Sequence, residues 1–417
     1  MSPHTRCGTE RKEPIMYDIL QRRLSGLKTD ATEFARELIH TESVSLQEAQ
    51  AADLVEQKLR DLGFHVVTRD DYGNVVGALL GRRADTTLAL VSHLDTVPAA
   101  SDDPHPCEIR DGRLYGLGAA DCKGGLTAQL YGAFLLKHSL LPLDGNLVVA
   151  ATVAEENGLS LGVRGLMERT LPELNLKPDY VILGEPTGLD LYYGHDGWME
   201  VDIQVEGVNP FQVEDIAQNL ADDLDEVMSG TESAGEDFVL ARNGRQQQGG
   251  VALVSMRIAK RLRQHGEETG ILNQITHEAE QNARTTNAVK VAVRVRQEAQ
   301  RLYTGRTVAA RRVVSAWSTD PFHPLMTRAR QALAAAGCNS RPGKWRLGRL
   351  GMGTAGSVLV NEFQTATIGY GPGLETQAHA RGEFVELEKL YSAIYGTAAI
   401  AHSLIGIPVC GWTTDEI

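Results

Sequence analysis

Predominantly apolar runs, many with β-branched residues, recur in the first half of the chain and again near its end. They occupy residues 89–92, 146–154, 179–184 and 365–370. Short apolar runs bounded by turn residues are typical of strands buried in a sheet. Segments with apolar residues at helical spacing alternate with them. These segments lie at residues 30–42, 47–62, 126–134, 325–335 and 385–404. The alternation predicts an α/β fold in which the main domain has a mixed sheet with helices on both faces.

The segment from 192 to 312 has a different pattern. Its predicted elements are an alternating strand at 199–205, an acidic helix at 210–228, a polar loop at 229–250 and strands at 251–258 and 289–295. Strands and helices in this order predict a small α+β domain that is inserted as a lid. The main domain is then discontinuous and comprises residues 16–191 and 313–406.

Side chains that can bind metal or transfer protons follow the apolar runs. They are His93 after the first run, Asp121 just before a predicted helix, Glu155 and Glu156 after the second run, Glu185 after the third and His379 in the loop after the fourth. Each has an ordinary alternative when taken singly: a core histidine, a helix N-cap, acids in solvated turns, or a histidine in a surface loop. Open α/β sheets, however, place their sites at the carboxyl ends of strands. The coincidence of all these positions favours a single site.

Two imidazoles and three carboxylates are the donors that a pair of zinc-like ions needs. These donors are His93, Asp121, Glu156, Glu185 and His379. The carboxylate of Asp121 has two oxygens and can bridge two cations in a dinuclear hydrolytic site. Neighbouring side chains on a strand diverge, so Glu156 can bind metal while Glu155 acts as a general base. Asp95 lies two residues beyond His93, where its carboxylate can accept the other ring N–H and fix the tautomer.

In order and spacing these motifs resemble the zinc-dependent amidohydrolase and exopeptidase family of acetylornithine deacetylase, succinyl-diaminopimelate desuccinylase and glutamate carboxypeptidase. The resemblance spans most of the chain. The segments that carry it are 93–98, Asp121 with 123–125, Glu155 with Glu156, 185–187, and 371–373 followed by His379 and Glu383.

The resemblance implies that Asp121 bridges two Zn²⁺ ions, with Co²⁺ or Mn²⁺ as alternative metals. The remaining ligands divide into His93 with Glu185 on one ion and Glu156 with His379 on the other. The ions would polarise the scissile carbonyl and lower the pKa of a shared water, whose proton Glu155 would pass to the leaving nitrogen. The main domain is then a catalytic domain. The expected reaction is hydrolysis of the amide bond of an N-acyl amino acid or a related small amide, and Glu185 rather than an aspartate resembles the deacylase and carboxypeptidase branch.

The chain departs from the family pattern in the predicted lid and in one loop. Relatives usually carry an arginine where this chain has Asp196, and a histidine in the region where residues 208–211 read Val-Asn-Pro-Phe. They also tend to have Thr-Asp where this chain has Thr354 and Ala355. Loss of one oxyanion donor costs about 10²–10³-fold in turnover in systems where it has been tested. Substitute donors would be His195, His265 or His277, for which the alternative is an ordinary surface histidine.

Three functions therefore stay open. The first is the amidohydrolase, and the second is an exopeptidase of carboxypeptidase or dipeptidase type that acts on short peptides by the same chemistry. The third is a catalytically weak member that binds metal or a small ligand. The intact Glu155 and ligand set count against the third function, and the altered lid counts for it. Arg294 and Arg296 are candidates to hold a substrate carboxylate by bidentate contact, with arginines that simply face solvent as the alternative.

Composition narrows the class of partner. With 417 residues, of which 42% are hydrophobic, the chain is long enough for two cores. A formal net charge of −13 argues against nucleic acid or an anionic membrane as the main partner. No apolar run approaches the roughly 20 residues that span a bilayer, and the opening residues lack a signal-peptide core, so we expect a cytoplasmic protein.

The cysteines and the predicted lid indicate which covalent links and which oligomeric state to expect. The 5 cysteines form no Cys-x-x-Cys pair and leave an odd count, which argues against a disulfide framework. Cys122 is expected to be a packed small residue rather than a zinc ligand. The resemblance implies a homodimer formed through the lid, although the departures from the family fall in that domain.

Overall fold

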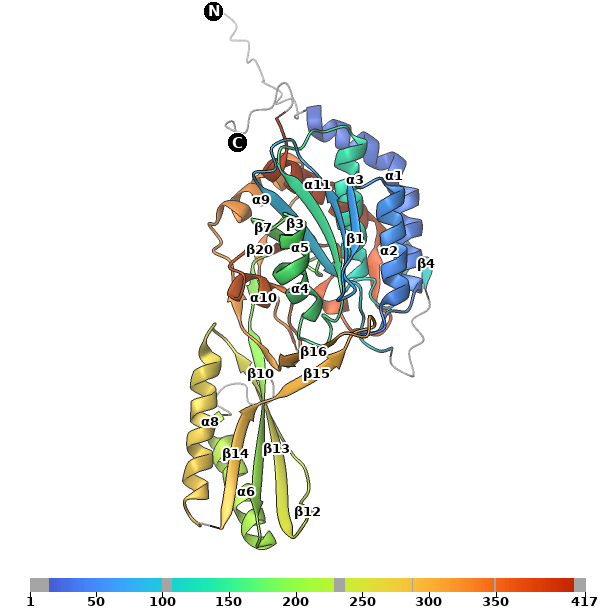
Figure 1. Cartoon of the computed structure of the whole chain (residues 1–417). Coiled ribbons are helices and arrows are strands. Elements are labelled where there is room, and N and C mark those ends of the chain that lie inside the picture. Colours follow the sequence, from blue (N-terminus) through green and yellow to red (C-terminus); the bar gives the residue numbers. More distant parts are fainter. Residues whose placement is uncertain (1–14, 100–106, 229–236, 287, 349, 409–417) are drawn as a thin grey trace, which may run out of the picture.

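The computed structural model describes residues 15–99, 107–228, 237–286, 288–348 and 350–408, which form an upper and a lower unit (Figure 1). The upper unit holds a mixed sheet with the strand order β1-β2-β6-β3-β7-β20-β8-β19. Its strands are β1 (Val66–Arg69), β2 (Val75–Leu79), β6 (Asn146–Thr152), β3 (Thr87–His93), β7 (Tyr180–Leu183), β20 (Ala366–Gly369), β8 (Leu191–Tyr192) and β19 (Pro342–Gly343). Strand β3 runs parallel to β6 and β7, and β20 runs parallel to β7, whereas β2 pairs with β6 in antiparallel orientation. Both β3 and β6 are buried along their whole length, which is why they read as continuous apolar runs.

Helices cover both faces of this sheet. One face carries α1 (Ile15–His40), α2 (Ala49–Asp61), α3 (Lys123–His138), α9 (Pro324–Ala335) and α11 (Leu387–Ile405). The other face carries α4 (Leu161–Gly165), η1 (Leu166–Thr170), α5 (Leu171–Glu173) and α10 (Gly356–Asn361). A small separate sheet consists of β21 (Phe384–Glu386), β5 (Arg113–Tyr115) and β4 (Glu108–Arg110). The first helix, predicted from residue 30, already includes residues from Ile15, because Leu20, Leu24 and Leu27 extend its buried face.

The lower unit, called the lid below, has a sheet and a core of its own. The order of its main strands is β11-β13-β10-β14. Its strands are β11 (Phe238–Arg242), β12 (Gln246–Gln248), β13 (Val251–Leu262), β10 (Gly197–Gly207), β14 (Val289–Val295) and β17 (Val313–Val314). Helices α6 (Pro210–Met228) and α8 (Glu267–Ala283) pack against this sheet around the lid core. An inserted α+β lid beside a mixed sheet with helices on both faces confirms the predicted fold class.

The lid contains secondary structure that the sequence pattern did not predict. Strands β11 and β12 lie within the predicted loop 229–250 and pair with β13, so the loop prediction is wrong there, while 229–236 lie outside the described residues. An edge strand with one exposed face needs few apolar residues, and β11 buries Phe238 fully and Leu240 partly. Helix α8 was also missed, because its buried residues recur only every fourth position, from Ile271 to Ala279, in a polar segment.

Short strands lie where the chain runs from one unit to the other. They are β9 (Gly194–His195), β18 (Trp317–Ser318), β15 (Gln297–Arg301) and β16 (Thr307–Arg311). Strand β9 pairs with β18, and β10 pairs with β17 just beyond them. The β15–β16 hairpin falls inside the predicted lid range but packs on the upper unit, where the Tyr303 hydroxyl donates to the carbonyl oxygen of Gly73 at 2.9 Å. The domain boundaries stay a prediction.

Helix α3 approaches β7 too closely for a side chain at one position. A Cβ added to Gly125 would lie 1.7 Å from the carbonyl oxygen of Gly184, the residue before Glu185. We expect Gly125→Ala to lower the free energy of unfolding by about 3 kcal/mol, because the helix or the strand end must move. Urea denaturation followed by tryptophan fluorescence measures this change. Gly270→Ala in α8 is the matched control, since its Cβ meets nothing within 4 Å and it should stabilise by up to about 1 kcal/mol. Equal stability of the two variants would contradict the expectation.

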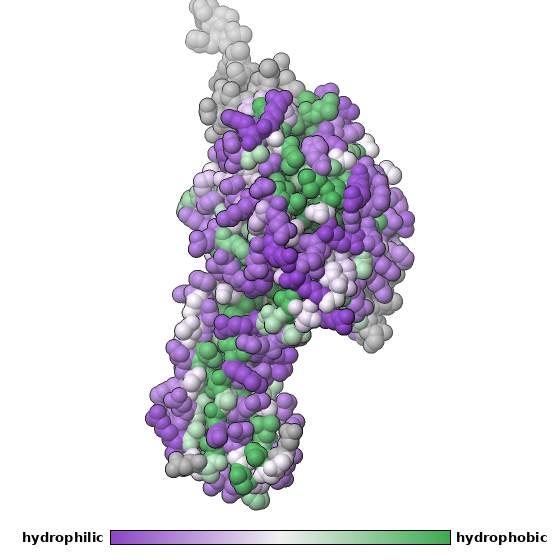
Figure 2. Space-filling view, in the orientation of Figure 1, coloured by the Kyte–Doolittle hydropathy of each residue, from purple (hydrophilic) through white to green (hydrophobic). Residues whose placement is uncertain are grey.

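The surface mixes hydrophilic and apolar residues. Figure 2 shows both kinds on the displayed face, with apolar residues gathered along the middle of the lid. Val208 and Phe211, at the start of the lid helix α6, are exposed. None of the helices within the described residues is long and apolar enough to cross a bilayer.

Candidate metal centre

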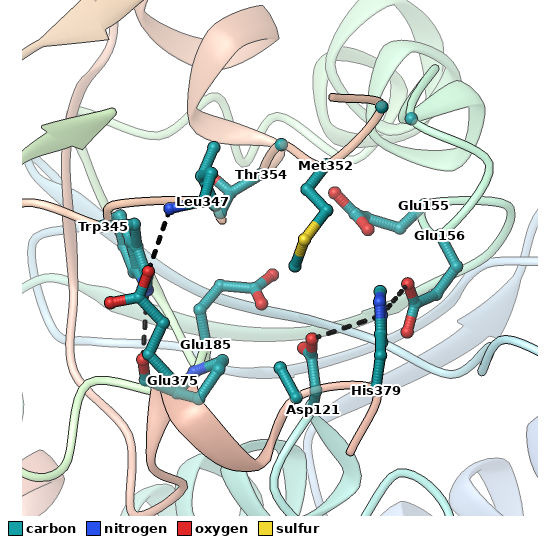
Figure 3. Close-up of a pocket in the computed structure, with 15 residues that line it drawn as sticks. Asp121, Glu155, Glu156, Glu185, Trp345, Leu347, Met352, Thr354, Glu375 and His379 are labelled. Carbon is teal, nitrogen blue, oxygen red and sulfur yellow. Dashed lines mark hydrogen bonds and ion pairs between the residues drawn. The ribbon is translucent and has the colours of Figure 1, made fainter. Parts of the chain in front are cut away.

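Four predicted ligands (Asp121, Glu156, Glu185 and His379) and the predicted base Glu155 line one pocket (Figure 3). The fifth predicted ligand, His93, is buried next to Asp121. His93 ends β3, Glu155 and Glu156 follow β6, Glu185 follows β7, His379 follows β20 and the short helix η2 (Glu375–Gln377), and Asp121 lies two residues before α3. The strands concerned are parallel neighbours, so their carboxyl ends lie at the same edge of the sheet. The fold therefore brings all five predicted ligands and the predicted base together.

Asp121 lies between two groups of potential ligand atoms. Its Oδ1 is 3.1 Å from His93 Nε2, which is 3.8 Å from Glu185 Oε2. Its Oδ2 is 3.7 Å from His379 Nε2, which is 2.7 Å from Glu156 Oε2. Within each group the candidate ligand atoms lie within 4.8 Å of one another. The two oxygens of one carboxylate thus face different groups, as a bridging carboxylate requires.

Acidic side chains crowd this pocket. They are Asp121, Glu155, Glu156 and Glu185. Burial raises the pKa of Glu185 to about 7 and raises the pKa values of Glu155 and Glu156 well above their ordinary value. Neighbouring carboxylates add to the shifts of Glu155 and Glu156. Buried charges of one sign are costly unless they are paired, so this donor set is suited to cations.

Glu155 differs from its neighbour Glu156 in its surroundings. Both line the pocket, but Glu155 belongs to neither ligand group. Its Oε1 accepts a long hydrogen bond, of 3.5 Å, from the Ser160 hydroxyl. The carboxylate of Glu155 therefore faces the space beside both ligand groups, where a general base would be needed.

Asp95 supports the site, but its backbone oxygen rather than its carboxylate lies nearest to the His93 ring. The Nδ1 atom of His93 lies 2.8 Å from the backbone oxygen of Asp95, whereas the Asp95 carboxylate is 3.7 Å away. The carboxylate instead accepts hydrogen bonds from the backbone N–H groups of Glu155 and Glu156, at 2.9 and 3.0 Å, and from the Ser45 hydroxyl at 2.7 Å. The predicted carboxylate acceptor for the ring N–H is therefore replaced by the backbone oxygen of the same residue, and the carboxylate lies only at ion-pair distance from Nδ1. Asp95 orients His93 through its main chain and holds the Glu155–Glu156 turn through its side chain.

Two further buried acids hold the backbone around the site. Glu48 accepts from the N–H of Ala154 at 3.0 Å, and burial raises its pKa to about 7. Glu383 accepts from the N–H groups of Ala120 and Asp121, at 2.7 and 3.0 Å. Glu383 was part of the recognised motif but had no assigned role. Glu48 was missed, because an acid at the start of an amphipathic helix is an ordinary sequence feature.

Cys122 is fully buried beside the first ligand group. Its Sγ accepts a hydrogen bond from the His93 N–H at 3.2 Å. The sulfur is also close enough to His93, Asp121 and Glu185 to be counted among their potential ligand atoms. Burial raises the pKa of the Cys122 thiol, which keeps the sulfur neutral and agrees with a packed small residue.

The far side of the pocket is built by the segment from Trp345 to Thr354, for which the sequence predicted no role beyond the departure at Thr354 and Ala355. This side of the pocket is lined by the side chains of Trp345, Leu347, Met352 and Thr354 and by the Glu375 carboxylate. Glu375 Oε1 accepts from the backbone N–H groups of Arg346 and Leu347, at 2.7 and 3.0 Å. The only signal for this wall was the glycine-rich character of residues 348–356 together with the Thr354–Ala355 departure.

The lid residues that were considered for substrate contact lie elsewhere. Arg294 is exposed on β14, and Arg296 is paired with Glu200 at 2.6 Å. Neither belongs to the described residues that line the pocket. His265 is exposed, whereas His195 is buried, so the surface alternative is wrong for His195.

A family model described as Peptidase family M20/M25/M40 matches residues 89–403, which is well over half of the chain. The chain belongs to peptidase family M20/M25/M40. The matched range includes every predicted ligand of the metal centre, and the resemblance stated from the motifs is confirmed.

Curated relatives match this chain over about half of their own length. A succinyl-diaminopimelate desuccinylase of Corynebacterium glutamicum is 33% identical over 179 residues, which is 43% of this chain and 47% of that protein. Succinyl-diaminopimelate desuccinylase 2 of Ruegeria is 30% identical over 191 residues, covering 43% and 48%. The uncharacterised protein YgeY of Escherichia coli is 27% identical over 200 residues, covering 47% and 48%. The chain thus spans about half the length of the curated relatives that it matches.

Solved structures of peptidases share the fold over most of this chain. The aminopeptidase PepT of Bacillus cereus superimposes with a TM-score of 0.66 at 18% identity, over 92% of this chain and 98% of that one. The YXEP protein of Bacillus subtilis, described as a dinuclear metal-binding peptidase, gives a TM-score of 0.66 at 14% identity, over 90% and 98%. At these identities the likeness is one of fold.

Proposed function

We propose that this protein is a dinuclear metal hydrolase that cleaves the amide bond of an N-acyl amino acid or a related small amide. The observation that carries the proposal is the position of Asp121, whose two oxygens face separate ligand groups. The proposed ions are two Zn²⁺, with Co²⁺ or Mn²⁺ as alternatives. His93 and Glu185 would complete one site, and Glu156 and His379 the other.

The donor set fits such ions. Imidazole nitrogens and carboxylate oxygens suit zinc, and the crowded buried acids call for positive charge. Divalent ions bound there would supply Lewis acidity toward the amide carbonyl and make water a better nucleophile near neutral pH.

The protein's own groups would then handle the proton. Glu155 belongs to neither ligand group and faces the pocket, so it can take a proton from the attacking water and deliver it to the leaving nitrogen. Asp95 holds the Glu155 and Glu156 amides, which keeps the base and its ligand neighbour in register. The products would be a carboxylate and an amine.

Two observations support the proposed substrate class: the names of two curated relatives and the residues that line the pocket. Two curated relatives are named as desuccinylases, enzymes that remove an acyl group from an amine. Trp345, Leu347 and Met352 offer an apolar surface to a substrate side chain or acyl group. We also propose that the protein is cytoplasmic and forms a homodimer.

The test combines metal analysis with a substrate panel. We expect about two equivalents of zinc in the purified protein, and turnover on at least one member of a panel of N-acetyl and N-succinyl amino acids and dipeptides. Turnover restricted to dipeptides would favour the exopeptidase. Two equivalents of metal without turnover would favour the binding protein, and absence of metal after reconstitution with zinc would refute the assigned centre.

A further inference from the structure

We propose that His195 is a positioning residue that fixes the Thr354 side of the substrate pocket by accepting a hydrogen bond from the Thr354 amide. The proposal rests on the proposed function, because it concerns the wall against which that substrate would bind. It assigns a role to a histidine at the passage between the lid and the upper unit.

The hydrogen bonds of His195 determine which ring nitrogen carries the proton. Nδ1 lies 2.6 Å from the backbone oxygen of Asp196, which can only accept, so Nδ1 is the donor. Nε2 is then unprotonated, accepts from the Thr354 N–H at 2.9 Å, and lies 3.0 Å from the Thr354 hydroxyl oxygen. Because the protein itself uses both nitrogens, His195 is not available to replace the missing oxyanion donor.

The surroundings of the ring favour this neutral form. His195 is 2% exposed and packs edge-on against Trp317 and Trp345, with centroid distances of 5.6 and 6.3 Å. Burial lowers the pKa of His195 to about 4, so the imidazole is neutral at neutral pH and can accept at Nε2.

His195 contacts the pocket wall at two points. Thr354 lines the pocket directly. Trp345 lines it as well, and its indole N–H donates to the carbonyl oxygen of Pro186, beside Glu185, at 3.0 Å. Figure 3 shows Trp345 and Thr354 on the side of the pocket opposite His379. A single ring therefore supports both parts of the wall that faces the metal centre.

The Thr354 amide depends on this acceptor. Thr354 is buried, and a buried N–H without a partner is costly, so the chain would rearrange if Nε2 were removed. The segment is tightly packed, since a Cβ on the preceding Gly353 would lie 2.8 Å from Val314 Cγ1. Displacement of the Thr354 amide would therefore change the shape of the wall.

Two substitutions separate the effect of the aromatic ring from the effect of the hydrogen-bond acceptor. His195→Phe keeps an aromatic ring between the tryptophans but removes Nε2, whereas His195→Gln keeps an acceptor near the Nε2 position and removes the ring. Hydrogen exchange of residues 351–358, measured by mass spectrometry on the full chain, should be faster by about tenfold in His195→Phe and within about twofold of wild type in His195→Gln. His265→Phe, at an exposed lid histidine, is the matched control and should leave exchange unchanged.

Kinetics provide the functional readout. On the best substrate of the panel, His195→Phe should raise KM by about tenfold with kcat within about twofold, because the wall binds substrate without touching the reacting atoms. His195→Gln should restore KM to near the wild-type value. Metal content should be the same in wild type and both variants.

Several results would overturn the proposal. Wild-type exchange in both variants would show that Nε2 does not hold the segment, and equal loss of kcat at constant KM would place His195 at the reacting atoms. If His195→Phe does not fold, ¹⁵N spectra of the wild-type imidazole decide: protonated Nδ1 and free Nε2 support the proposal, and protonated Nε2 refutes it. Exchange and NMR require no turnover, so failure of the proposed hydrolysis is distinguishable from failure of this inference.

Discussion

Replacing Glu155 by glutamine is expected to lower kcat by about 10²–10⁴-fold while the protein keeps its metal. Glutamine has nearly the same shape but cannot take a proton, and general-base catalysis contributes a factor of this size. Glu155 belongs to neither ligand group, so its loss should leave both groups intact. The measurements are kcat on the best panel substrate and metal content by mass spectrometry.

The adjacent Glu156 is the matched control. Its Oε2 lies 2.7 Å from His379 Nε2, within the second ligand group. Glu156→Gln should therefore lose about one equivalent of metal, which Glu155→Gln should not. If both variants lost the same amount of metal, or if Glu155→Gln kept full turnover, the division of roles between these neighbours would be wrong.

The second large effect is expected at Asp121. Asp121→Asn should reduce bound metal to below about one equivalent and lower kcat/KM by about 10³-fold or more, because loss of Lewis acid stabilisation costs several kcal/mol of barrier. The reason is geometric: both ligand groups share this one carboxylate through different oxygens. An amide oxygen carries no negative charge and is a weaker ligand for a divalent ion.

Asp111→Asn provides the same chemical change in the exposed turn between β4 and β5. It should retain the metal content and activity of the wild type. Addition of a chelator to wild type should lower the melting temperature, since metal that binds only the folded state stabilises it, and Asp121→Asn should show a smaller decrease. A variant with two equivalents of metal and normal kcat/KM would refute the bridging role.

Much of the candidate site could be predicted from the order of the motifs along the chain. Buried parallel strands have long apolar runs, and such runs must end where the chain meets solvent, so reactive residues directly after them fall on one sheet edge. His93, Glu156 and Glu185 could be placed together on this basis. The case for Asp121 and His379 was weaker, because a helix start and a long loop do not by themselves indicate the sheet edge, and the family resemblance added their division between two ions.

Supporting residues were harder to find because their contacts are between main chain and side chain. Glu48 and Ala154 are distant in sequence, as are Glu383 and Asp121, and such hydrogen bonds leave no periodic signal. For the same reason, the hydrogen bonds of the Asp95 carboxylate to the Glu155 and Glu156 amides could not be predicted. From the sequence, His195 was either a substitute donor or a surface histidine, whereas the pairing of β9 with β18 buries it among aromatic residues.

The amino-acid sequence by itself determined the fold class, the family and the set of candidate ligands, because hydrophobic periodicity and motif spacing are local properties of the chain. Only the tertiary structure decided which oxygen of Asp121 faces which histidine, that Glu155 belongs to neither ligand group, and that Arg294 and Arg296 lie away from the pocket. These are distances between elements that are remote in the chain, and they depend on strand register, helix packing and the path between the two units.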